Sequence, residues 1–190
     1  MDTLTAPRTN APTPAAAAAP ARTPSRNESS YGAAHGQTAN APGREYLSFC
    51  LGQEEYGIDI LKVQEIRSYE APTRIANAPS FLKGVINLRG VIVPVIDLRV
   101  KFGCEAEITA ITAVVVLSVK GRIVGAVVDS VSDVLELPHA LVKPAPEMGT
   151  LVDTSHLMGI ANVNERMLIL LDIESLMSSS ELGLIDAASH

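Results

Sequence analysis

The alternation of apolar and polar residues predicts that ordered structure begins near residue 44. Apolar side chains occupy every second position from Leu47 to Leu51, and again from Tyr56 to Ile60. A period of two is typical of β-strands with one buried face. The polar residues 52–54 between the two runs predict a turn. The chain therefore starts with two strands, the first of them half-buried.

The strongest apolar pattern is the segment 84–98, with the sequence GVINLRGVIVPVIDL. It predicts two strands, at 81–87 and 91–97, joined by a short polar turn. Pro94 has no amide donor, so we expect a sheet edge or a bulge there. In the preceding segment, 61–67, the apolar spacing fits a helix and a strand equally well.

This hairpin pattern recurs 75 residues later as GIANVNERMLILLDI, at 159–173. The earlier strands also recur, 68 residues on, and the second copy has seven extra residues between Val134 and His156. Such a repeat predicts one β unit used twice, with about five short strands in each half. A unit of ~60 residues is only marginally stable alone, so we expect two small barrels that share an apolar seam. The copies differ mainly at the hairpin turn, which points to the turn as a partner surface.

Composition divides the chain into a tail and a body. Residues 1–43 hold six of the twelve prolines and almost no aliphatic side chains, which predicts a disordered Ala/Pro-rich tail. Residues 44–190 are expected to form one domain of two interleaved subdomains, roughly 44–110 and 111–190. A broken apolar stripe predicts a C-terminal helix from about residue 173.

Charge and residue usage narrow the functional classes. Of the net charge of −6, residues 1–44 contribute +2 and the remainder −8, and there is no Trp among the 190 residues. An acidic body with few rings argues against nucleic-acid binding. Two separated cysteines suit a reducing compartment without disulfides. No signal peptide is evident and no apolar run approaches the ~20 residues of a membrane span, so we expect a soluble cytoplasmic protein.

Reactive residues do not form a recognisable catalytic or metal site. His139 and His156 have no second ligand at metal-binding spacing, and Cys50 has no visible partner base. Asp97 and Asp172 are equivalent in the repeat, which favours a shared structural role at a strand end. We therefore expect no catalytic residue, no cofactor and no metal, and the chain is interpreted as a binding module.

Two residues stand out as candidate contacts. Arg89 in the hairpin turn can present a charged fork to a partner carboxylate, although by pattern alone it is a solvated turn residue. Met148 in the Pro-containing insertion is either an adaptable protein contact or a lid over the second barrel.

Several of these segments together resemble the CheW family, the coupling proteins of bacterial chemotaxis. The matching blocks are EEYGIDILKVQEIR at 54–67, GVINLRG at 84–90, PVIDLR at 94–99, VSDVL at 131–135 and RMLIL at 166–170. The resemblance runs from about residue 44 to the C-terminus and implies a mainly β fold of two SH3-like five-stranded barrels. It also implies a non-catalytic adaptor in a ternary complex with the histidine kinase CheA and the cytoplasmic tip of methyl-accepting chemoreceptors. The protein would then be recruited to membrane-associated chemoreceptor clusters, without inserting into the membrane.

The resemblance also assigns candidate contact residues by position. Those that would face the receptor are Val63, Glu65, Gly84 and Arg89. Those that would face the regulatory domain of the kinase are Arg74 and Ile75, in the loop 72–75, and Glu147 and Met148. The Ala/Pro-rich tail departs from the family pattern.

Other functions stay open from sequence alone. The chain could serve another chemosensory-type pathway, whereas a CheV-type protein needs a receiver domain and a whole CheA needs an ATP-binding segment. A small β-barrel enzyme using Cys50 or His156 would need a concave pocket that joins them. A module for Pro-rich peptides normally needs an aromatic groove, and aromatic residues are only 4% of this chain.

Overall fold

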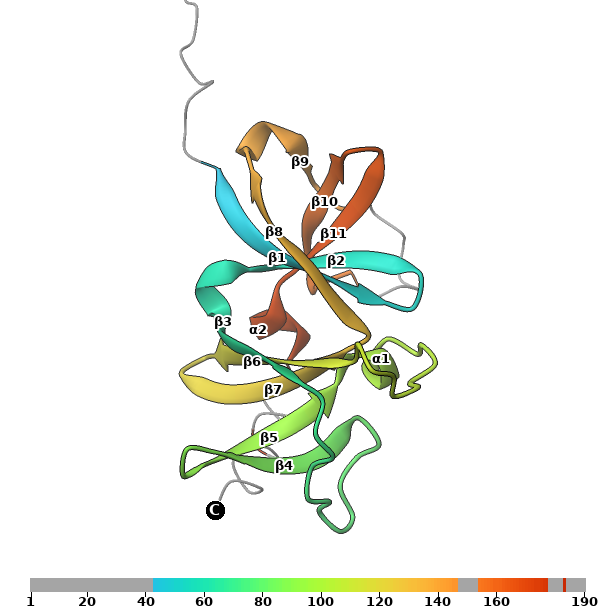
Figure 1. The fold of residues 1–190 in the computed structure, drawn as a ribbon. Helices are drawn as coiled ribbons and strands as arrows, with labels where there is room; N and C mark the ends of the chain where they lie inside the picture. The colour runs from blue at the N-terminus through green and yellow to red at the C-terminus, as the bar shows by residue number, and fades with distance from the viewer. Residues whose placement is uncertain (1–42, 147–153, 178–182, 184–190) are drawn as a thin grey trace, which may run out of the picture. The chain divides into compact units, whose positions relative to one another are not determined.

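Two mixed β-sheets make up most of the computed structural model, which describes residues 43–146, 154–177 and 183 (Figure 1). Sheet A has the strand order β8-β1-β2-β11-β10-β9, and sheet B has the order β3-β6-β7-β5-β4. The strands are β1 (Arg44–Leu51), β2 (Glu54–Asp59), β3 (Val63–Ser68), β4 (Leu82–Leu88), β5 (Val91–Asp97), β6 (Ala113–Val119), β7 (Arg122–Val128), β8 (Ser130–Leu137), β9 (Val142–Lys143), β10 (Leu157–Val163) and β11 (Arg166–Leu171). The helical turns are η1 (Ile60–Lys62), α1 (Leu98–Lys101), η2 (His139–Leu141) and α2 (Ile173–Leu176).

The sequence repeat reappears as a repeat in the topology. If β1, β2, β3, β4 and β5 are exchanged for β6, β7, β8, β10 and β11, the order of sheet A without β9 becomes the order of sheet B. The parallel pairs β11–β2 and β5–β7 correspond as well. Each sheet takes strands from both halves of the sequence, because the chain changes sheets between β2 and β3 and again between β7 and β8. The strand exchange explains how two marginal halves share one structure.

The predicted strands are found, with one correction. The ambiguous segment 61–67 divides between η1 and β3. The first strand is not half-buried, since Tyr46 and Ser48 are as buried as Leu47. Pro94 was expected at an edge or a bulge, and it pairs with β4 alone, because the pairing of β5 with β7 begins only at Val95.

The core has three apolar clusters, two of which bury the two faces of β1. The largest draws on both sheets and includes Leu47, Phe49, Ile96 and Met177. A second comes from sheet A alone, and includes Tyr46 on the opposite face of β1. A third comes from sheet B alone. The largest cluster therefore forms the seam between the sheets, and each sheet also covers a smaller core of its own.

Asp97 and Asp172 share the structural role that their equivalence predicted. Asp97 caps α1 by accepting from the backbone N–H of Arg99, at 3.1 Å. Asp172 caps α2 by accepting from the N–H groups of Glu174 and Ser175, at 3.0 and 3.3 Å. Each carboxylate satisfies donors that a helix start leaves unpaired.

Two predictions fall largely outside the described residues. The expected tail, 1–43, contains only one described residue, Gly43. Of the segment expected to form a C-terminal helix, the structure describes only the four-residue turn α2, Met177 and residue 183. In the described part of the chain, no helix has the length and apolar character needed to cross a membrane.

Candidate functional site

The turn between β4 and β5 presents Arg89 to solvent. Arg89 and Gly90 form a two-residue connection with φ angles of +51° and +90°, between the paired residues Leu88 and Val91. Two positive φ angles match the type I′ turn that joins tightly paired strands. The Asn87 side chain accepts from the Gly90 N–H at 2.7 Å and fixes the turn. Arg89 is held by a rigid hairpin while its side chain stays 87% exposed.

Arg89 contacts a second predicted receptor residue. Its Nη2 donates to Oε2 of Glu65 on β3 at 2.8 Å. Strands β3 and β4 are the two edges of sheet B. Neighbouring strands lie about 4.8 Å apart, so a flat five-stranded sheet would keep these side chains out of reach of one another. The ion pair thus shows that sheet B curls until its edges approach at the hairpin turn.

An apolar groove of about 220 Å³, here called the turn groove, opens beside this ion pair. Val91 and Ile123 at this groove are 52% and 40% exposed. Its lining residues are Gln64, Glu65, Leu88, Arg89, Val91, Val93, Val116 and Ile123. An apolar floor with a charged rim suits a protein partner better than a small polar substrate. The apolar lining residues were not singled out from the sequence, where they read as ordinary strand positions.

The other two predicted receptor residues are not part of this groove. Val63 is half-buried and packs against the cluster between the sheets. Gly84 is buried, with φ of +142°, and a Cβ there would lie 2.0 Å from the carbonyl oxygen of Thr73. Thr73 and Val85 exchange two backbone hydrogen bonds of 2.9 Å. Gly84 therefore allows the loop that follows β3 to dock on β4.

That loop carries the first pair of predicted kinase contacts. Arg74 is exposed and Ile75 is half-buried. Both line a groove of about 280 Å³, together with Ala78, Pro79, Ser80, Leu82 and Lys83. Because Thr73 is bonded to β4, the position of Arg74 depends on the same strand that leads to Arg89.

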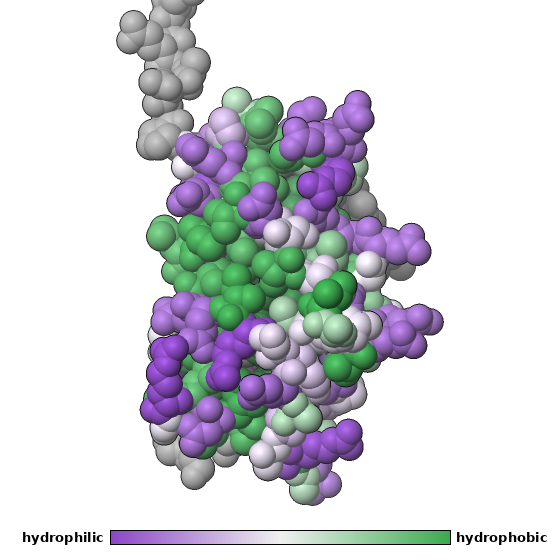
Figure 2. Space-filling view, in the orientation of Figure 1, coloured by the Kyte–Doolittle hydropathy of each residue, from purple (hydrophilic) through white to green (hydrophobic). Residues whose placement is uncertain are grey.

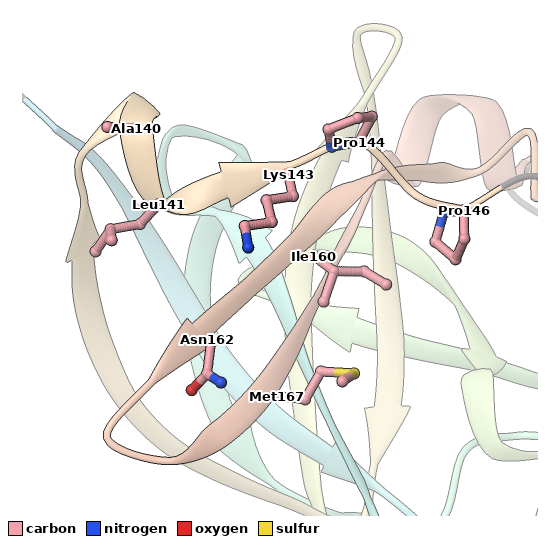
Figure 3. Close-up of a pocket in the computed structure, with 8 residues that line it drawn as sticks. All are labelled: Ala140, Leu141, Lys143, Pro144, Pro146, Ile160, Asn162 and Met167. Atoms are coloured by element: carbon pink, nitrogen blue, oxygen red, sulfur yellow. The ribbon is translucent and has the colours of Figure 1, made fainter.

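The second pair, Glu147 and Met148, lies outside the described residues. The segment before them borders an apolar groove of about 400 Å³, here called the insertion groove (Figure 3). Figure 3 shows side chains of the β9 segment on one side and of β10 and β11 on the other. The lining residues are Ala140, Leu141, Lys143, Pro144, Pro146, Ile160, Asn162 and Met167. Met167 and Leu141 are 62% and 47% exposed. The sequence did not indicate this exposure, because Met167 belongs to an apolar strand and Leu141 to the insertion.

Equivalent glycines support the two predicted kinase segments. Gly159 lies 75 residues after Gly84, and a Cβ there would lie 2.6 Å from the carbonyl oxygen of Lys143. Lys143 pairs with Ile160 as Thr73 pairs with Val85. The segments that lead to both predicted kinase contacts therefore dock in the same way, one on each sheet.

A fourth concavity, here called the edge groove, runs between the two sheets. It has a volume of about 580 Å³, and Ile66 and Ile111 at its rim are 46% and 68% exposed. Its lining residues are Ile66, Arg67, Ser68, Ala110, Ile111, Thr112, Ala113, Ser130 and Val131. Figure 2 shows a broad hydrophobic area on the side where η1, β3 and β8 face the viewer in Figure 1. Glu65 lines the turn groove and Ile66 lines the edge groove. Because successive side chains of a strand point to opposite faces, the two concavities lie on the two faces of the edge strand β3.

Lys62, Glu174 and Arg99, whose pKa values are shifted, are held in ion pairs rather than poised for chemistry. The Glu174 hydrogen bond raises the pKa of Lys62, and the same bond lowers the pKa of Glu174. Burial lowers the pKa of Arg99, but the hydrogen bonds and charges of Asp97 and Asp129 outweigh that effect and raise it, so Arg99 stays charged.

The described residues place the candidate nucleophile and base in separate surroundings. Burial, with added repulsion from Glu54 and Asp129, raises the pKa of the Cys104 thiol. Cys50 Sγ lies 3.9 Å from the Ser132 hydroxyl, whereas His156 packs edge-on against the Phe102 ring, with centroids 5.4 Å apart. The described residues contain no group of three His, Cys, Asp or Glu side chains that could hold a metal ion.

Comparison with known proteins places this arrangement among chemotaxis proteins. Residues 45–181 match the family model of the CheW-like domain. The chemotaxis protein CheW of Klebsiella aerogenes is 58% identical over 151 residues, which cover 78% of this chain and 91% of that protein. The Bacillus subtilis CheW is 33% identical, over 77% of this chain and 96% of the relative. The crystal structure of the scaffolding protein TtCheW from Thermoanaerobacter tengcongensis superimposes with a TM-score of 0.67 at 31% identity, covering 73% of this chain and 95% of that one.

Proposed function

The chain belongs to the family of CheW-like domains, and we propose that it is a non-catalytic adaptor that couples transmembrane chemoreceptors to the histidine kinase CheA. The adaptor domain in this proposal comprises residues 44–190, as two SH3-like barrels preceded by the tail 1–43. The protein makes and breaks no covalent bond. It is recruited to receptor clusters at the membrane through protein contacts alone.

The observation that carries the proposal is the separation of two kinds of surface. The turn groove and the edge groove both border β3, whereas the insertion groove is lined by β9, β10 and β11 and shares no residue with either of them. Separate surfaces let one chain hold two partners at once, which is what a coupling protein must do.

The receptor surface in this proposal comprises the turn groove and the edge groove, on the two faces of the edge strand β3. A helical receptor tip can lay an apolar stripe into a groove while polar groups at the rim fix its register. Ile66 and Ile111 supply apolar contact area, and Arg89 supplies a fork for a carboxylate. Glu65 orients that fork. Gly84 and Val63 contribute by positioning the hairpin and β3 rather than by touching the receptor.

The kinase surface in this proposal has two parts. Arg74 and Ile75 form one contact, and Glu147 and Met148, beside the insertion groove, form the other. The regulatory domain of the kinase resembles this family and is expected to have apolar strand surfaces of its own. In this proposal, such a surface packs against the exposed Met167 and Leu141. Exposed apolar patches of this kind are typical of protein contacts.

Signal transfer then follows from differential binding. If a receptor rearrangement changes its contacts at Arg89, the adaptor favours one arrangement of the bound kinase over another. The size of the response is limited by the difference in binding free energy between the two receptor states.

Co-sedimentation with receptor-containing membranes tests the proposal. The wild-type chain should pellet with the membranes, carry CheA into the pellet and raise kinase autophosphorylation. A chain that pellets with neither partner, and leaves kinase activity unchanged, would contradict the proposed function. Lys120→Glu is a matched control for Arg89→Glu, because Lys120 is also an exposed first residue of a β-turn, with φ of +49°.

A further inference from the structure

The chain crosses between the sheets twice, and each crossing is held by a residue of a short helix. The equivalent positions Arg99 and Glu174 lie in α1 and α2. Arg99 Nη1 donates to Oδ1 of Asp129, at the crossing between β7 and β8, at 3.1 Å. Glu174 accepts from Lys62, at the crossing between β2 and β3. The two ion pairs thus lie at the two crossings, and the helix residue is the cation in one pair and the anion in the other.

The two pairs differ in their exposure to water. The side chains of Lys62 and Glu174 are 39% and 35% exposed, whereas that of Arg99 is 0% exposed. A half-exposed pair contributes little and can rearrange. A buried guanidinium, in contrast, keeps its position only if nearly all of its donors are satisfied.

Arg99 meets that requirement with partners from three segments. Its Nε and Nη2 form a fork with the Asp97 carboxylate, at 2.9 and 3.0 Å. Its Nη1 donates both to Asp129 and to the carbonyl oxygen of Glu107. Four of the five N–H donors of the guanidinium are therefore used. Asp129 in turn accepts from the Gly52 N–H at 2.7 Å, which extends the network to the turn between β1 and β2.

Two of these partners lead directly into the walls of the edge groove. Asp129 immediately precedes the wall residues Ser130 and Val131. Glu107 lies in the loop whose continuation, Ala110 to Ala113, forms a second wall. One buried cation thus tethers two walls that come from different parts of the sequence.

We propose that Arg99 is a positioning residue that sets the spacing of the edge groove, and so its fit to the apolar stripe of a helical partner. The identity of that partner rests on the proposed function, whereas the effect of Arg99 on the spacing of the groove does not depend on it. Removing Arg99 alone leaves the buried Asp97 carboxylate without its fork and so costs stability as well. The loss of defined spacing is the consequence that distinguishes a positioning role from a purely stabilising one.

Spin labels across the groove test the spacing. Labels are attached at Ala110→Cys, in one tethered wall, and at Ser132→Cys, next to the wall residue Val131, two exposed positions, in a background with Cys50→Ser and Cys104→Ala. Arg99→Met and the milder Asp129→Asn should shift or broaden the distance distribution. Lys62→Met should leave it unchanged, because Lys62 tethers the other crossing. Thermal melts identify any variant that fails to fold, and Asp129→Asn retains an acceptor for Gly52.

Binding measurements on the same variants complete the test. We expect Arg99→Met to weaken pelleting with receptor-containing membranes by about tenfold while binding to the isolated kinase regulatory domain stays within about twofold. An unchanged distance distribution in both network variants would overturn the inference, as would a changed distribution with wild-type receptor binding. If the wild-type chain does not bind receptor membranes at all, the proposed function fails, and the distance measurement alone decides whether Arg99 sets the spacing.

Discussion

Arg89 and Glu65 are joined by a 2.8 Å hydrogen bond although they come from opposite edges of sheet B. The resemblance assigned both residues to the receptor surface without placing them together. Their contact means that a partner carboxylate near Arg89 must share or displace an existing carboxylate. The turn groove therefore favours a partner that offers Arg89 a second hydrogen-bond acceptor and covers the apolar floor beside it.

Charge reversal at this pair should separate binding from folding. Arg89→Glu places a carboxylate on the exposed turn, facing Glu65 of β3, and removes only a solvent-exposed ion pair, so the free energy of unfolding should change by less than about 0.5 kcal/mol. Receptor binding should weaken by about tenfold, because a charge-assisted contact is replaced by repulsion. Pull-down with receptor fragments and urea denaturation measure the two effects. Lys120→Glu should change neither, and wild-type receptor affinity in Arg89→Glu would refute the assignment.

The double variant Arg89→Glu/Glu65→Arg tests whether the pair itself matters. The swap restores the ion pair in reverse, with Arg presented from β3 rather than from the turn. We expect part of the lost receptor affinity to return. A double variant as weak as Arg89→Glu alone would mean that the cation must occupy the turn.

Gly84→Ala should act through the loop that carries Arg74. The new Cβ would lie 2.0 Å from the Thr73 carbonyl oxygen, and the backbone φ of +142° disfavours a side chain. We expect a loss of about 2–4 kcal/mol in the free energy of unfolding, the range of steric overpacking combined with backbone strain. Gly121→Ala is the control, since its φ is +78° with open space around it, and it should cost only about 1–2 kcal/mol. Equal losses in the two variants, measured by urea denaturation, would contradict the docking role of Gly84.

Sequence patterns predicted the individual strands better than which strands lie next to one another. The hairpin at 81–97 and the equivalence of Asp97 and Asp172 follow from periodicity and repeat, which are local. Pro94, expected at an edge or a bulge, lies just before the residues of β5 that pair with β7. The burial of Ser48 was missed, since the second cluster behind β1 comes from distant strands.

The candidate site was predicted in part for a related reason. Arg89 stood out because the repeat diverges at its turn, and the family resemblance added Glu65. Nothing in the sequence indicated that Met167 and Leu141 would be exposed, because strand periodicity does not say which face a neighbouring insertion covers. Arg99 was not singled out either, although an Arg two residues after a capping Asp is the local signal that could have found it.

Met167→Lys should weaken binding to the kinase regulatory domain. The side chain is 62% exposed at the insertion groove, so the substitution removes apolar contact area and adds a charge that must be desolvated. We expect affinity to fall by about tenfold or more, with little change in the free energy of unfolding. Calorimetric titration with the isolated domain measures the affinity. Met158→Lys, at a 41% exposed position that does not line the groove, should bind like the wild type.

Asp172 should make stability depend on pH in the acidic range. Burial raises its pKa, but the hydrogen bonds from Ser175 and the Glu174 N–H outweigh burial, so the net pKa is lowered from 3.8. A lowered folded-state pKa gives stability that is complete above the unfolded value and is lost as pH falls through the folded value.

Replacing Asp172 tests this dependence. Asp172→Ala should lose about 1 kcal/mol at neutral pH, the usual contribution of a helix N-cap, and its deficit should shrink below about pH 4. Asp172→Asn should keep most of the cap at neutral pH without the acidic dependence. Denaturation midpoints at several pH values measure both variants, and a deficit in Asp172→Ala that stays constant down to pH 2 would exclude the ionised cap.

Simultaneous binding of both partners is the most direct test of the adaptor account. The wild-type chain is mixed with receptor-containing membranes and CheA, and the pellet is analysed for all three proteins and for kinase activity. We predict a ternary pellet from which Arg89→Glu removes the receptor link alone, and Met167→Lys removes the kinase link alone. If receptor and kinase instead compete for the chain, so that each displaces the other, the account of two separate surfaces is wrong.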